Sequence, residues 1–204
     1  MTPKKRTILK LNSSGRNTGS VSRQLANRLV DRLLAADPDA SVIVRDAAVG
    51  LSAVTEDWIN ANFTPSAQRT PDQAGLLALS DQLVAEIRAA DTLVIGLPIY
   101  NFGIPAALKE WIDLVCRSGE TFRYGTSGPE GLLTDKRAFV TVASGGVPVG
   151  SPMDHATTYL TQVLGFLGIT DVTYVSAAGL AMDADAAIAA ANRQIDQIDL
   201  GQAA

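Results

Sequence analysis

The sequence is poor in the residues that build disulfides and zinc sites. Its 204 residues include one cysteine and one histidine. A lone cysteine excludes a disulfide within the chain, and one residue of each kind is too few for a Cys/His zinc site. We therefore expect no metal, and the low use of cysteine leads us to expect a protein of the reducing cytoplasm.

Long apolar runs and an excess of positive charge are also missing. The longest apolar stretches, such as residues 92–99, fall far short of the roughly 20 residues that cross a bilayer. The N-terminal segment lacks the hydrophobic core and cleavage site of an export signal. Seventeen basic residues against twenty-one acidic ones leave a net charge of −4. We therefore expect neither a membrane span nor a nucleic-acid partner.

Aromatic residues are scarce, at 5% of the chain, whereas 47% of the residues are hydrophobic. The core must therefore be built from Ala, Val, Leu and Ile. A chain of this length and composition is long enough for one α/β domain and too short for two, so residues 1–204 are predicted to form a single domain.

Hydrophobic periodicity predicts alternating strands and helices. Residues 91–97 form a near-continuous apolar run typical of a strand buried on both faces, while Leu76, Leu79, Leu83 and Ile87 recur at helical spacing. The predicted strands are 6–12, 41–46, 91–97, 136–144 and 171–176, and the predicted helices are 21–33, 56–61, 71–90, 105–115, 154–167 and 184–198. This alternation predicts a doubly wound α/β fold with a parallel sheet and helices on both faces. Periodicity alone leaves two strand orders open, 2-1-3-4-5 and a truncated nucleotide-binding order.

Hydroxyl side chains follow the first predicted strand. Ser13, Ser20 and Ser22 lie where the chain enters a helix, and a helix N-terminus offers unpaired N–H groups to a phosphate. The alternative is an ordinary serine cap. Two known phosphate motifs, a Gly-Lys-Ser/Thr loop and G-x-G-x-x-G, are missing.

Two further loops follow the third and fourth predicted strands. Residues 98–105 place two aromatic side chains and an amide between prolines, and residues 144–148 contain paired glycines that let a ligand approach the backbone. In the order 2-1-3-4-5, all three loops converge on the crevice at the topological switch point. A phosphate site, an aromatic wall and a backbone edge together suit a flat mononucleotide such as FMN.

Three segments of the chain resemble one known family. They are 98–102 (PIYNF) with Leu108-Lys109, 121–124 (TFRY) with 128–132 (GPEGL), and 164–171 (LGFLGITD). They are similar to the FMN-dependent NADH azoreductases, which are also NAD(P)H:quinone oxidoreductases, and the resemblance covers nearly the whole chain. It implies a flavodoxin-like fold of order 2-1-3-4-5, FMN as cofactor, and a homodimer with active sites at the subunit interface.

The resemblance assigns cofactor-binding positions to the three loops. The implied phosphate-binding residues are Ser13, Ser20, Val21 and Ser22; the ring-lining residues are Pro98, Ile99, Tyr100, Asn101 and Phe102; and the residues at the pyrimidine edge are Ser144, Gly145 and Gly146. Tyr124 and Phe166 are implied positions for stacking on the substrate. Members often have Ser-Arg-Gly-Gly after the fourth strand, and here Ser144 is the candidate to replace the hydroxyl absent at Ala143.

The activity implied by the resemblance is a two-electron, ping-pong reduction. Hydride passes from NADH or NADPH to flavin N5, and a quinone or azo compound is then reduced in the same pocket. Two other classes of protein fit the sequence less well. A flavodoxin-type electron carrier is disfavoured by the length and modest charge of the chain, and a serine hydrolase lacks the G-x-S-x-G motif.

A few other residues invite a role that the sequence does not support. His155 is expected to be an exposed residue at a helix start, and Cys116 to be a small buried residue rather than a redox centre. Trp58 and Trp111 are expected at packing or dimer surfaces.

Overall fold

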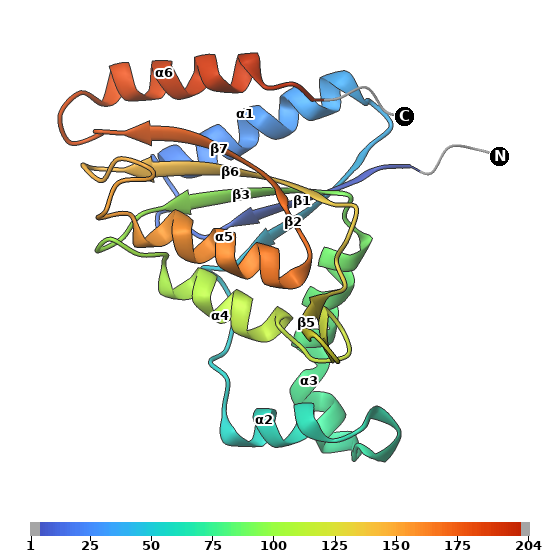
Figure 1. Ribbon diagram of the computed structural model, residues 1–204. Helices are drawn as coiled ribbons and strands as arrows, with labels where there is room; N and C mark the ends of the chain where they lie inside the picture. Colours follow the sequence, from blue (N-terminus) through green and yellow to red (C-terminus); the bar gives the residue numbers. More distant parts are fainter. Residues whose placement is uncertain (1–4, 201–204) are drawn as a thin grey trace.

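A computed structural model describes residues 5–200 and shows one parallel sheet between two layers of helices (Figure 1). The sheet has five strands in the order β2-β1-β3-β6-β7. In chain order these strands are β1 (Thr7–Asn12), β2 (Ser41–Asp46), β3 (Thr92–Pro98), β6 (Arg137–Ser144) and β7 (Asp171–Ala178). Because β6 and β7 are the fourth and fifth strands predicted from the sequence, the expected fold and its order 2-1-3-4-5 are confirmed.

Helices cover both faces of the sheet. Helices α1 (Val21–Ala36) and α6 (Ala184–Gln197) pack on one face, and α3 (Pro71–Ala89), α4 (Ala106–Val115) and α5 (His155–Leu167) pack on the other (Figure 1). Successive side chains of a strand point to opposite faces. Accordingly, Val94 of β3 belongs to the core under α1 and α6, whereas its neighbours Leu93 and Ile95 belong to the core on the other side.

The helix ends follow from local sequence signals. Thr70 and Gln73 form a capping box at the start of α3, with Pro71 at the first helical position. Asp154 caps α5 by accepting hydrogen bonds from the N–H groups of Ala156 and Thr157. The same helix ends at Gly168, whose φ of 100° is readily available only to glycine.

The predicted apolar face of α3 is partly wrong. Leu83 and Ile87 are buried as expected, but Leu76 is 45% exposed and Leu77 is buried in its place. The buried face of α3 therefore differs from the predicted one, and it includes a polar residue. Ser80 is fully buried, and its hydroxyl donates to the Leu114 carbonyl at 2.6 Å. A helix face that is predicted from the spacing of apolar residues alone does not include a buried serine on the adjacent face.

Four short elements complete the described chain. Helix α2 (Glu56–Phe63) was expected, and with the start of α3 it extends away from the sheet (Figure 1). The 3-10 turn η1 (Ser66–Gln68) and the antiparallel hairpin of β4 (Phe122–Gly125) and β5 (Gly128–Gly131) were not predicted. Strands of four residues, rich in Gly, Pro and charge, are too short to display a period.

Trp58 and Trp111 are buried, at 8% and 1% exposure, so both are packing residues. His155 is exposed, as expected. Cys116 packs against the core but remains partly exposed, so its expected burial is only half right. Within residues 5–200, no helix has the length and apolar character that a bilayer crossing needs.

Candidate functional site

Three loops leave the carboxyl ends of β1, β3 and β6, which are adjacent strands in the sheet. We call them the β1 loop (residues 13–20), the β3 turn (residues 100–103) and the β6 loop (residues 144–148). The Ser13 hydroxyl donates to the Gly96 carbonyl at 2.7 Å, and the Ile99 N–H donates to the Ala143 carbonyl at 2.9 Å. These bonds fix the bases of the loops to one another at the switch point of the sheet.

The β1 loop leads into an open helix N-terminus. Ser20 is the N-cap of α1, but its side chain makes no capping hydrogen bond. Its hydroxyl instead lies 3.3 Å from the hydroxyl of Ser22, and both residues are buried. Among residues 5–200, no acceptor is found for the N–H groups of positions 21–23. Two hydroxyls and three free donors at the positive end of a helix form a suitable site for an anion.

Ser13 is placed differently from the other two serines. It is fully buried, and its hydroxyl proton is directed to the carbonyl of Gly96 on β3. The Ser13 hydroxyl thus links the β1 loop to β3, whereas Ser20 and Ser22 lie at the helix start, and phosphate binding by Ser13 stays a prediction.

The β3 turn presents two aromatic side chains on a tight backbone. Tyr100 and Gly103 exchange two backbone hydrogen bonds of 3.0 Å. The two residues between them, Asn101 and Phe102, have φ angles of 48° and 71°. Such values are unusual for residues with a side chain, and for Phe102 they are a source of strain that tends to occur at ligand sites. Tyr100 and Phe102 are 41% and 52% exposed.

Helix α5 supports this turn from the side. The His155 N–H donates to the Phe102 carbonyl at 3.1 Å. The preceding residue, Asp154, is buried. Burial alone would raise the pKa of Asp154, but hydrogen bonds from the Thr157 hydroxyl and from the N–H groups of Thr157, Gly150 and Ala156 outweigh burial and hold the pKa below its ordinary value. An ionised Asp154 thus anchors the helix start that holds Phe102.

The β6 loop offers backbone donors. The Ser144 hydroxyl accepts a hydrogen bond from the Val147 N–H at 2.8 Å, and the Ser144 and Gly145 carbonyls accept from Leu180 and Ala181. The N–H groups of Gly145 and Gly146 have no acceptor within the described residues. A Cβ atom on Gly146 would have no neighbour within 4 Å, so this backbone borders open space. The loop is therefore fixed by its carbonyls and by the bond between Val147 and Ser144, and the N–H groups of Gly145 and Gly146 remain available.

Tyr124 and Phe166 do not join the three loops. Their rings pack around Phe122, with centroids 5.6 Å and 4.5 Å from it. Phe166 lies near the end of α5, eleven residues beyond His155, which corresponds to roughly 16 Å along a helix. The end of α5 and the adjacent β4–β5 hairpin, which carry these two residues, therefore lie away from the three loops of the same chain (Figure 1).

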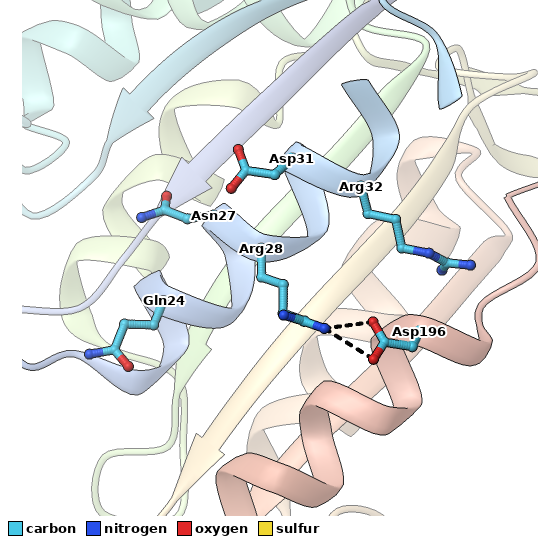
Figure 2. Close-up of a pocket in the computed structure, with 6 residues that line it drawn as sticks. All are labelled: Gln24, Asn27, Arg28, Asp31, Arg32 and Asp196. Atoms are coloured by element: carbon cyan, nitrogen blue, oxygen red, sulfur yellow. Dashed lines mark hydrogen bonds and ion pairs between the residues drawn. The ribbon is translucent and has the colours of Figure 1, made fainter. Parts of the chain in front are cut away.

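Two hollows of the surface lie away from the three loops. One is between α1 and α6, where Arg28 meets Asp196 at 2.7 Å (Figure 2). In the same region, Arg32 donates to carbonyls at the end of α6. The other hollow lies at the amino ends of the sheet strands, opposite the three loops, and its lining includes Thr92 and Asp171. Within residues 5–200, no group of three or more His, Cys, Asp or Glu residues could hold a metal.

The crevice has one support that sequence reasoning missed. Arg23, in the first turn of α1, donates to the Ser14 carbonyl and to the carboxylate of Asp46. The available signal was a basic residue entering α1 together with an acidic residue ending the next strand. The sequence did not show that these two residues meet.

The fold and the crevice define a flavodoxin-like protein, and residues 6–198 match the protein family described as having the flavodoxin-like fold. The chain is 54% identical over 191 residues to "FMN-dependent NADH:quinone oxidoreductase 1" of Jannaschia sp. (strain CCS1), covering 94% of this chain and 97% of the relative. It is 50% identical over 188 residues to the protein of the same name from Hahella chejuensis, covering 92% of each. This chain belongs to the family of FMN-dependent NADH:quinone oxidoreductases.

Solved structures agree with this assignment. An azoreductase from Bacillus anthracis is 29% identical, with a TM-score of 0.84, and the match covers 94% of this chain and 96% of the other. The azoreductase AzrA is 30% identical with the same TM-score, covering 93% of this chain and 96% of the other.

Proposed function

We propose that this protein is an FMN-dependent oxidoreductase that uses NADH, or NADPH, to reduce quinones and azo compounds. The observation that carries the proposal is the convergence of an open helix N-terminus, an aromatic turn and free backbone donors at one switch point of the sheet. Its relatives are named for the same cofactor and the same donor. The single cysteine supports a reducing, cytoplasmic location.

The residues present fit FMN group by group. Ser20 and Ser22, with the N–H groups of positions 21–23, would bind the phosphate. The backbone and side chains of residues 98–102 would line one face of the ring. Gly145 and Gly146 would donate from their N–H groups to its polar edge. When bound, FMN supplies hydride acceptance from the nicotinamide and two-electron delivery to the acceptor.

The protein's part in the reaction is binding, orientation and shielding. The β3 turn would cover one side of the ring, so that donor and acceptor must use the other side in turn. The braced positions of the loops favour this fixed arrangement, because hydrogen bonds hold each loop at its base. We infer a ping-pong mechanism in which the nicotinamide leaves before the quinone or azo compound enters.

A homodimer is the second part of the proposal. Ile59 and Phe63 of the projecting helix α2 are 42% and 78% exposed, and Tyr124 is 74% exposed. Exposed apolar side chains of this size favour a protein partner, and a two-fold dimer is the commonest closed assembly. Because Tyr124 and Phe166 lie far from the crevice of their own chain, they would approach a bound substrate only across such an interface.

Steady-state kinetics of the purified holoprotein test the enzymatic proposal. Double-reciprocal plots of rate against NADH at several quinone concentrations should be parallel. Intersecting lines would require both substrates to bind together and would refute the shared site. A yellow protein that releases FMN but oxidises no NADH with any quinone or azo dye would be an electron carrier instead.

A further inference from the structure

Arg23 links the β1 loop to the end of β2. Its side chain is 14% exposed. Nη1 donates to Asp46 Oδ2 at 2.6 Å, and Nη2 donates to Asp46 Oδ1 at 3.0 Å and to the Ser14 carbonyl at 2.6 Å. Both Nη atoms are thus engaged with oxygens of the protein itself, which is the arrangement of a brace rather than of a ligand-binding group.

Asp46 is itself held in place. It ends β2 and is the register partner of Asn12 on β1, so the side chains of these two residues lie on the sheet face that α1 covers. Its Oδ1 also accepts from the Ala48 N–H at 3.1 Å, and the Ala47 N–H donates to the Asn12 carbonyl at 2.8 Å. The carboxylate therefore fixes the guanidinium from the rigid edge of the sheet.

Ser14 is the residue at which this support reaches the crevice. Its carbonyl accepts from Arg23, its hydroxyl accepts from the Arg16 N–H at 3.2 Å, and the same hydroxyl lies 3.3 Å from the hydroxyl of Tyr100. The path of the β1 loop toward Ser20 thus depends on the position of Ser14. A shift of this carbonyl would move the loop that leads to the helix N-terminus.

We propose that Arg23, oriented by Asp46, is a positioning residue that sets the β1 loop for binding a phosphate monoester, and so gives the protein its preference for FMN over riboflavin. The inference rests on the proposed function, since it needs FMN phosphate at Ser20 and Ser22. It requires the planar fork of arginine, because one guanidinium must satisfy a carboxylate in two places and a carbonyl in a third. A lysine keeps the charge but not this geometry.

The test compares the affinities of FMN and riboflavin in full-length protein freed of flavin, by quenching of flavin fluorescence. The variants are Arg23→Lys and Asp46→Asn. The control is Arg28→Lys, which changes an arginine on the same helix whose Nη2 donates to both carboxylate oxygens of Asp196, away from the crevice. Loss of a charge-assisted contact corresponds to an affinity loss of about tenfold to hundredfold.

We expect both variants to weaken the binding of FMN by at least about tenfold and the binding of riboflavin by less than about threefold. Arg28→Lys should leave both affinities unchanged. Because the two side chains act as one unit, a variant that combines Arg23→Lys with Asp46→Asn should bind FMN about as tightly as either single variant does. Equal loss of both flavins would mean that Arg23 only stabilises the fold, and would overturn the inference. Variants that bind both flavins as tightly as the wild-type protein would overturn it while leaving the phosphate site intact. A wild-type protein that binds riboflavin as tightly as FMN would instead refute the phosphate site itself, and the inference with it.

Discussion

Gly131 ends the β4–β5 hairpin and, among the glycines in residues 5–200, is the one at which an added Cβ atom would lie closest to other backbone atoms. A Cβ atom at this position would lie 2.2 Å from the Gly168 nitrogen and 2.3 Å from the Leu167 carbonyl carbon. Both neighbours are backbone atoms at the end of α5, so no side-chain rotation relieves the clash. The hairpin would have to move away by about 1.2 Å to restore an ordinary contact of 3.4 Å.

This movement would break a neighbouring hydrogen bond as well. The Leu133 N–H donates to the Leu167 carbonyl at 2.9 Å, and a displacement of that size takes the pair beyond hydrogen-bonding distance. Overpacking costs about 1 to 3 kcal/mol, and the lost bond about 0.5 to 1.5 kcal/mol. We therefore expect Gly131→Ala to lower the free energy of unfolding by about 3 kcal/mol, and the Tm by roughly 6 to 12 °C.

Thermal and urea unfolding followed by circular dichroism measure this change. The matched control is Gly125→Ala in the same hairpin, where the added Cβ atom would lie 3.6 Å from the Gly128 carbonyl oxygen and 3.8 Å from a Glu130 carboxylate oxygen, both ordinary contacts. If Gly131→Ala and Gly125→Ala unfold within about 0.5 kcal/mol of each other, the argument from the close contact is wrong.

Three further predictions concern the cofactor, the pH response and the assembly. Ser20→Ala combined with Ser22→Ala should weaken FMN by about tenfold to hundredfold and riboflavin far less, and equal weakening in a binding titration would exclude phosphate contact. Asp154→Ala should cost about 0.5 to 2 kcal/mol near neutral pH. Because the folded pKa of Asp154 is lowered, its contribution is present above the unfolded value of about 3.9 and fades as the pH falls through the lower folded value; a stability difference that is constant in urea titrations from about pH 6 to pH 2 would contradict this. The wild-type protein should sediment at about 43 kDa, twice the chain mass of 21.4 kDa, and Phe63→Asp should shift it toward the monomer; a fully active wild-type monomer would argue against the dimer.

Much of the fold could be predicted from the sequence because its signals are local. The Thr70–Gln73 capping box and the apolar run of β3 each specify an element through a few neighbouring residues. The predicted bounds of the sheet strands agree with the observed ones to within two residues. The hairpin β4–β5 could not be predicted in this way, because it is fixed by contact with α5 rather than by a period of its own.

Part of the candidate site could likewise be predicted from the sequence, and part could not. Loops at the carboxyl ends of β1, β3 and β6 follow from the sequence, because parallel strands place these ends on one edge of the sheet. The sequence also contains the hydroxyls, aromatics and glycines of those loops. It does not contain the left-handed conformation of Asn101 and Phe102, which the bonds between Tyr100 and Gly103 impose.

The sequence by itself determined the class of fold, the type of each main element and the loops that form the crevice. Tertiary structure alone decided which side chains meet: it brought Arg23 to Asp46 and Ser14, and packed Phe166 against Phe122. The physical reason is that a hydrophobic period reports which face of an element is buried. Which residues of other elements lie against that face depends on how the helices pack on the sheet.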